Sequence, residues 1–146
     1  STDRLVVCGA PSYFARHGRP ATPAELVGHN CVHYTRVPVT GEWRFRDAER
    51  RPFVVPVRGN LACSDGQSMR YAAIAGAGLV VLPRFFVEAD VAEGRLELVL
   101  EGARRAEVGI YALFASRKQL PARTKLVIDH LATWFAAPDW RLRRSR

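Results

Sequence analysis

The segment between residues 64 and 83 places the strongest constraint on the fold of this chain. Ser64 and Asp65 can cap a helix, because short polar side chains accept hydrogen bonds from its first backbone N–H groups. The helix expected at 68–77 is rich in alanine and glycine, so it can pack closely on a sheet. The apolar run 79–82 that follows is typical of a strand buried on both faces. Strands and helices that alternate in this way along the chain predict an α/β architecture with a mixed or parallel sheet.

The rest of the chain alternates between short β-rich runs and helical segments. We expect the runs 31–35, 42–46 and 52–57 to form one small sheet, with an exposed turn at 47–51. A short helix should start after Thr22 and end near Gly28, because Thr22, Pro23 and Glu25 match a capping box. The other expected strands are 5–9, 60–63, 96–100 and 108–115, and the other expected helices are 12–18, 84–93 and 121–136.

Length, charge and cysteine use narrow the classes of protein that fit. The chain has 146 residues and 48% hydrophobic content, which suits one globular domain. Its net charge is +8, but four of these charges come from arginines in the last six residues, so we do not expect the chain itself to bind DNA. Cys8, Cys31 and Cys63 are widely spaced and odd in number, which argues against disulfides and for a reducing cytoplasm. No apolar run is long enough for a membrane span, and the N-terminus lacks the pattern of a signal peptide.

The motifs of common enzymes and cofactor sites do not occur. We find no G-x-S-x-G, G-x-G-x-x-G, phosphate loop or H-E-x-x-H, so we expect no enzyme, no catalytic residue and no cofactor. His29, Cys31 and His33 would share one face of a strand, which makes a soft-metal site conceivable. A fourth ligand at a suitable spacing is missing, and we therefore expect no metal site.

Nearly the whole chain, up to Ala137, resembles the effector-binding domain of LysR-type transcriptional regulators. The most specific match is the segment 64–83, whose order of polar cap, small-residue helix and apolar strand few other families combine. The other matching segments are 10–20, 23–26, 29–32, 43–45, 57–61, 94–96, 99–100, 110–114 and 120–123, with Phe135.

The resemblance implies a fold like that of type II periplasmic binding proteins, with two α/β lobes and an effector between them. It assigns residues 1–9 to an outgoing hinge strand, 10–107 to the second lobe, 108–137 to a return strand and a helix of the first lobe, and 138–146 to a basic tail. Most of the first lobe and a winged helix-turn-helix domain would then lie upstream of Ser1. We expect such an upstream part, because the chain opens without methionine and enters an apolar strand at once.

The resemblance and the physics of helix termini together suggest where a ligand binds. Unpaired N–H groups and a partial positive charge favour polar ligands at a helix start, although simple capping without a ligand explains the same residues. Asp65 would repel an anion there, which favours a neutral or amine-bearing effector. Small residues at the crossover could line the same cleft or merely let strands bend. The candidate ligand-binding residues are Ser64, Asp65, Gly66, Gln67, Cys8, Gly9 and Ala10.

The expected function is therefore effector sensing inside a transcriptional regulator. Its partners would be a small-molecule effector, DNA only through the missing N-terminal domain, and further copies of itself in a homo-oligomer. A solute-binding protein of the periplasmic type is the alternative. A third interpretation is an enzyme or a basic nucleic-acid-binding module that matches the pattern by chance.

Overall fold

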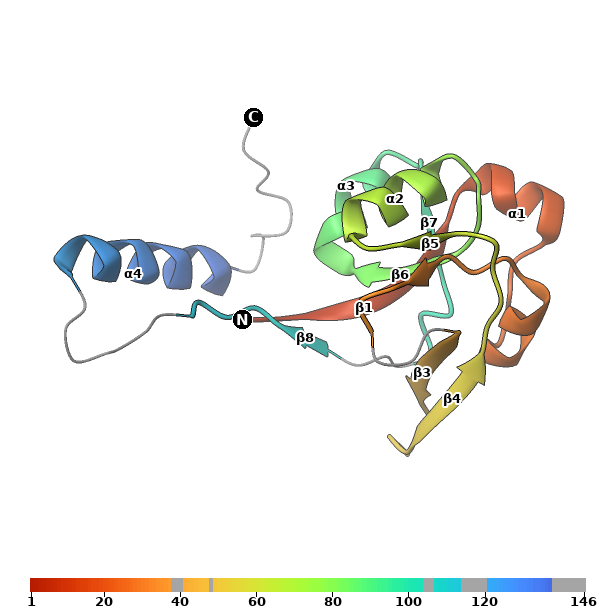
Figure 1. Cartoon of the computed structure of the whole chain (residues 1–146), viewed down its shortest axis with the longest axis horizontal. Helices are drawn as coiled ribbons and strands as arrows, with labels where there is room; N and C mark the ends of the chain where they lie inside the picture. The colour runs from red at the N-terminus through yellow and green to blue at the C-terminus, as the bar shows by residue number, and fades with distance from the viewer. Residues whose placement is uncertain (38–40, 48, 104–106, 114–120, 138–146) are drawn as a thin grey trace.

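A single long strand organises the molecule. The computed structural model describes residues 1–37, 41–47, 49–103, 107–113 and 121–137. Strand β1 (Thr2–Gly9) runs through its middle (Figure 1). The second half of β1 pairs antiparallel with β6 (Val80–Pro83) and β7 (Glu97–Val99), whereas its first half pairs antiparallel with β8 (Glu107–Gly109). One strand therefore belongs to two regions of the structure.

The two faces of this sheet bury different sets of side chains. Val6 and Cys8 of β1 face a cluster that includes residues of α2 (Gly66–Ile74) and α3 (Arg84–Ala92). Val7 faces an opposite cluster that includes residues of α1 (Pro11–His17) and the 3₁₀ helix η1 (Pro23–Gly28). Leu79 and Val80 are likewise fully buried in opposite clusters, which confirms the prediction of a strand covered on both faces. Because strand side chains alternate, apolar runs without alternation fit such a layer.

The expected small sheet of three strands is wrong. Strand β2 (His33–Tyr34) pairs in parallel with β5 (Ala62–Cys63), while β3 (Glu42–Arg46) and β4 (Pro52–Pro56) form a separate antiparallel hairpin. The segment before β2 pairs with the central sheet through a parallel bridge between Cys31 and Leu79. The hairpin instead packs its apolar face on the α1 side of the core. The exposed turn is confirmed, since the Asp47 N–H donates to the Arg51 carbonyl at 3.0 Å.

Two helices differ in detail from the prediction. The helix after Thr22 is a 3₁₀ helix, and Thr22 donates its hydroxyl to the Glu25 carboxylate (2.8 Å) instead of capping the backbone. The Glu25 carboxylate also accepts from the Ala21 N–H (3.0 Å), one residue before the predicted N-cap. Helix α2 starts two residues earlier than expected, at Gly66, and ends at Ile74 because Gly76 (φ +72°) takes the left-handed conformation that terminates it.

Helix α4 (Ala122–Ala136) lies apart from the other helices, beyond the N-terminal end of β1 (Figure 1). None of its residues is buried. The strand expected at 108–115 is shorter than predicted: β8 ends at Gly109, residues 110–113 form no strand, and 114–115 lie outside the described residues. None of the described helices has both the length and the apolar character that crossing a membrane requires.

Candidate functional site

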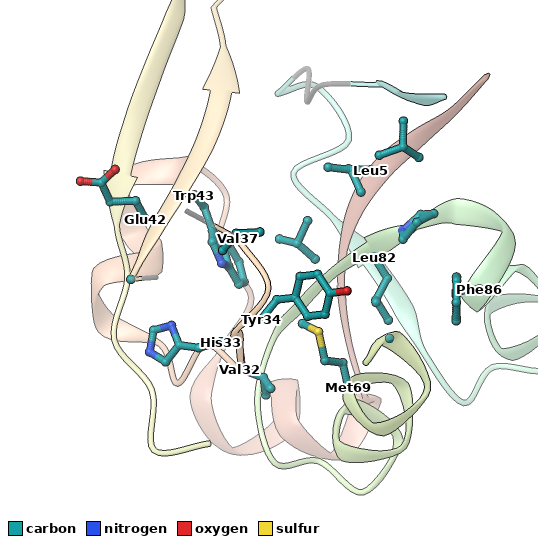
Figure 2. Close-up of a pocket in the computed structure, with 15 residues that line it drawn as sticks. Leu5, Val32, His33, Tyr34, Val37, Glu42, Trp43, Met69, Leu82 and Phe86 are labelled. Carbon is teal, nitrogen blue, oxygen red and sulfur yellow. The ribbon is translucent and has the colours of Figure 1, made fainter. Parts of the chain in front are cut away.

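A cavity of about 350 Å³ opens between the central sheet and the β3 strand (Figure 2). We call it the Tyr34 cavity, after the aromatic side chain that lies in its middle. The strands β1, β6 and β8, the starts of α2 and α3, and residues from 32–37 and 41–43 contribute its walls. The lining residues are Leu5, Val32, His33, Tyr34, Val37, Gly41, Glu42, Trp43, Gly66, Met69, Val81, Leu82, Pro83, Phe86 and Val108.

The walls are apolar almost throughout. Figure 2 shows the hydroxyl of Tyr34 within the cavity, toward Met69 and Leu82, whereas the imidazole of His33 and the carboxylate of Glu42 point away from it. No hydrogen bond to the Tyr34 hydroxyl occurs among the residues that the structure describes. The set of described lining residues includes neither lysine nor arginine. The described walls therefore offer an apolar surface and the unpaired hydroxyl of Tyr34, a combination typical of small-molecule sites.

The start of α2 closes one side of the Tyr34 cavity through Gly66. A methyl group at Gly66 would lie 3.2 Å from Phe86 and 3.4 Å from Leu82, so a larger residue would crowd the lining. The preceding residue, Asp65, caps the helix by accepting from the Ser68 N–H (2.8 Å) and the Ser68 hydroxyl (2.7 Å). The backbone hydrogen bond from Ser68 lowers the pKa of Asp65, with help from the Ser68 side chain. Asp65 is consequently ionised and already fills the helix N-terminus.

Of the predicted ligand-binding residues at 64–67, only Gly66 lines the Tyr34 cavity. Ser64, Asp65 and Gln67 are exposed beside it. The Ser64 carbonyl accepts from Arg36 at 3.0 Å, and the Gln67 amide donates to the Tyr71 hydroxyl at 3.4 Å. Direct ligand contact by these three side chains stays a prediction.

The predicted crossover residues Cys8, Gly9 and Ala10 are buried in the core, outside the lining of the Tyr34 cavity. Burial raises the pKa of the Cys8 thiol to about 12, with a smaller contribution from Asp90, so this thiol is unreactive at neutral pH. A methyl group at Gly9 would lie 2.8 Å from the Leu79 side chain, which accounts for glycine there by packing. Their contact with a ligand also stays a prediction.

The sequence analysis missed most of the cavity, above all Tyr34, Met69 and Phe86. One pattern could have indicated part of it. Tyr34 and Leu82 lie near the carboxyl ends of predicted strands, and open α/β sheets bind ligands beyond those ends.

Two polar contacts hold the walls of the cavity in place. The buried carboxylate of Asp3 on β1 accepts from the Phe85 N–H at 2.9 Å, which ties the start of α3 to the central strand. Asp90 of α3 is fully buried and accepts from Arg70 of α2 (Nη2 to Oδ1, 2.6 Å) and from Arg95 (2.8 Å). The positions of α2 and α3, and hence of Met69 and Phe86, depend on these contacts.

The trio His29, Cys31 and His33 does not assemble a metal site. No group of three or more potential ligands occurs in the part of the chain that the structure describes. Cys31 is fully buried, which raises the pKa of its thiol to about 12. His29 instead lies 3.2 Å from the Tyr13 hydroxyl through Nδ1.

Comparison with known proteins identifies the family to which this fold belongs. The profile of the LysR substrate binding domain family matches residues 1–136. The chain therefore belongs to the LysR substrate-binding domain family, and its α/β fold is the periplasmic-binding-protein-like fold of LysR regulatory domains.

Relatives and solved structures agree with this assignment. The chain is 31% identical over 129 residues to the HTH-type transcriptional regulator CrgA of Neisseria meningitidis, covering 88% of this chain and 42% of CrgA. It is 31% identical over 140 residues to PtxR of Pseudomonas aeruginosa, covering 96% of this chain and 45% of PtxR. The solved CrgA regulatory domain matches with a TM-score of 0.75 and 28% identity, over 91% of this chain and 65% of that domain. The chain thus spans less than half of the length of these curated relatives.

Proposed function

We propose that this chain is the effector-sensing part of a LysR-type transcriptional regulator and that the Tyr34 cavity receives the effector. The observation that carries the proposal is the place of this cavity beside the paired strands β1 and β8, which would form the hinge. Leu5 of β1 and Val108 of β8 line it together with Gly66 and Phe86 of the helices. A molecule bound there would contact both crossing strands, so its binding can shift the population of hinge conformations.

The pairing of β1 supports the division into hinge and lobe. Residues 1–9 would be the outgoing hinge, 10–107 the second lobe, and 108–137 the return strand and a helix of the first lobe. Both core clusters lie within 6–103, while α4 buries none of its residues. The predicted tail at 138–146 lies outside the described residues.

In the whole regulator, DNA binding would belong to an N-terminal winged helix-turn-helix domain and control would operate through a homo-oligomer in the cytoplasm. The chain would serve recognition and carry no catalytic activity, because its relatives are transcriptional regulators. The same relatives disfavour a free-standing solute-binding protein. Sequencing the natural reading frame upstream of Ser1 tests this assignment to a regulator. The frame should encode a helix-turn-helix followed by a half-lobe, and a signal peptide there would contradict the assignment.

Ligand entry into the Tyr34 cavity can be followed at one atom. Met69 is the single methionine of the chain and lines the cavity, so a ¹³C-methyl label on methionine reports from this site alone. We expect small apolar aromatic compounds, with benzamide as the first probe, to shift the Met69 methyl resonance in a saturable way.

Blocking the cavity should abolish this response. Val81→Phe adds volume to a lining residue, and we expect it to lower the affinity for benzamide by about tenfold or more. Val54→Phe is the matched control, because Val54 is 48% exposed on β4 and does not line the cavity. Equal responses in both variants would remove the Tyr34 cavity from the proposal.

A further inference from the structure

We infer that the Tyr34 cavity takes an uncharged, largely apolar molecule with one hydrogen-bonding group, such as a hydroxyl, carbonyl or amide, which meets the Tyr34 hydroxyl. The inference rests on the proposed function and adds the chemical class of the effector. It excludes carboxylates and phosphates as the preferred ligands of this site.

The first argument is that the described walls offer no positive countercharge to an anion. The described lining residues include no lysine or arginine, and the polar side chains of His33 and Glu42 point away from the cavity (Figure 2). A buried anion without a partner loses its hydration and gains nothing in return. Arg36, whose charge acts on Asp65, is exposed and donates to the Ser64 carbonyl at 3.0 Å.

The second argument is that the carboxylate of Asp65 already occupies the N-terminus of α2. A helix N-terminus attracts anions through its free N–H groups and its dipole. Here the carboxylate of Asp65 takes that position on α2, with bonds of 2.8 and 2.7 Å to the Ser68 N–H and hydroxyl. A second anion beside Gly66 would meet this negative charge. The cap thus converts an anion-binding helix end into an anion-repelling one.

The third argument is the state of the Tyr34 hydroxyl. It lies among apolar side chains, near Met69 and Leu82 in Figure 2, and no described residue accepts from it or donates to it. A ligand that offers one hydrogen-bonding group can satisfy it, and an entirely apolar ligand would leave it unpaired. The cavity volume of about 350 Å³ suits a molecule of one or two rings.

Benzamide and benzoate test the inference, because they have nearly the same shape and differ in charge at neutral pH. Each is titrated into the full chain with the Met69 methyl resonance as the readout. We expect benzamide to bind about tenfold or more tightly than benzoate. Tyr34→Phe should weaken benzamide binding by about fivefold, and Tyr71→Phe, which changes an exposed tyrosine away from the cavity, should not.

The role of Asp65 is tested by Asp65→Asn, which keeps a capping side chain and removes the charge. In this variant the ratio of the affinities for benzamide and benzoate should fall by about fivefold, while the affinity for benzamide stays the same. Asp65→Ser, which also caps helices, provides a second neutral variant should the first fold poorly.

The outcomes separate the inference from the proposed function. Tighter binding of benzoate than of benzamide would overturn the uncharged effector and leave the cavity as the binding site. Tighter binding of benzamidine, the cationic analogue, would also overturn it. If no member of the series shifts the Met69 resonance in the unaltered chain, the Tyr34 cavity itself fails as the site, and the inference falls with it.

Discussion

At the scale of single residues, Asp90 is the side chain on which the placement of α2 and α3 depends most. It is fully buried, and Arg70, its partner on α2, is only 7% exposed. Asp90→Asn keeps the shape but leaves the guanidinium of Arg70 without a countercharge. Breaking one side of a buried ion pair costs about 3–5 kcal/mol of the free energy of unfolding. Urea unfolding measures this loss, with Asp129→Asn in the exposed pair with Lys125 as a control that should change little.

The same residue gives the stability a pH dependence of known sign. Burial acts to raise the pKa of Asp90, but the hydrogen bonds and charges of Arg70 and Arg95 outweigh it and hold the pKa below its usual value. A carboxyl with a lowered folded pKa stabilises the protein above its unfolded pKa, and this contribution is lost as the pH falls through the folded pKa. The free energies of unfolding of Asp90→Asn and of the unaltered chain should therefore differ least at acidic pH. A constant difference at every pH would contradict the account.

Residues whose role is local could be predicted from the sequence, and those whose role depends on distant partners could not. Asp65 was predicted as a possible cap because its partner, Ser68, lies three residues away. The contribution of Tyr34 to a cavity depends on Met69 and Leu82, which join it only after the sheet has formed. The full burial of Cys8 could not be read from the sequence either, because burial is a property of the assembled core.

At the scale of elements, the arrangement of segments 30–31 and 58–59 explains why β2 does not join the β3–β4 hairpin. Bridges run from Asn30 to Arg58 and from Cys31 to Leu79, which place this crossing segment between two neighbours. The periodicity of each run could be read from the sequence, but the identity of its neighbours could not, because pairing over 28 or 48 residues leaves no local pattern.

Gly59 makes this crossing sterically feasible. A methyl group at Gly59 would overlap the carbonyl oxygen and carbon of Cys31, which are backbone atoms that cannot rotate away. We expect Gly59→Ala to destabilise the chain by about 2 kcal/mol or more and to disturb the β2–β5 pairing. Thermal unfolding followed by circular dichroism measures it. Gly28→Ala is the matched control, since nothing lies within 4 Å of the added methyl group there, and a similar loss in both variants would refute the steric explanation.

At the scale of the whole molecule, the apolar side chains of α4 fit the proposed first lobe better than the described one. Leu126 is 70% exposed, Val127 is 59% exposed and Leu131 is 40% exposed. The sequence predicts an amphipathic helix here, and its apolar stripe comprises Val127, Ile128, Leu131, Trp134 and Phe135. The helix itself was predicted correctly. The exposure of Leu126, Val127 and Leu131 could not be predicted, because a hydrophobic stripe indicates burial without identifying the surface that covers it.

This arrangement leads to a test of the lobe boundary by truncation. Removing the residues after Ala112 deletes α4 but leaves both core clusters, which lie within residues 6–103, and the pairing of β1 with β8. Because α4 buries no side chain, we expect the shortened chain to unfold cooperatively, with a free energy of unfolding changed by less than about 1 kcal/mol. A second truncation, after Gly94, removes the core residues Leu96 and Val99 and should abolish the transition. Thermal unfolding by circular dichroism compares the three chains. If loss of α4 alone abolishes cooperative unfolding, the second lobe does not fold as a unit and the proposed boundary near residue 107 is wrong.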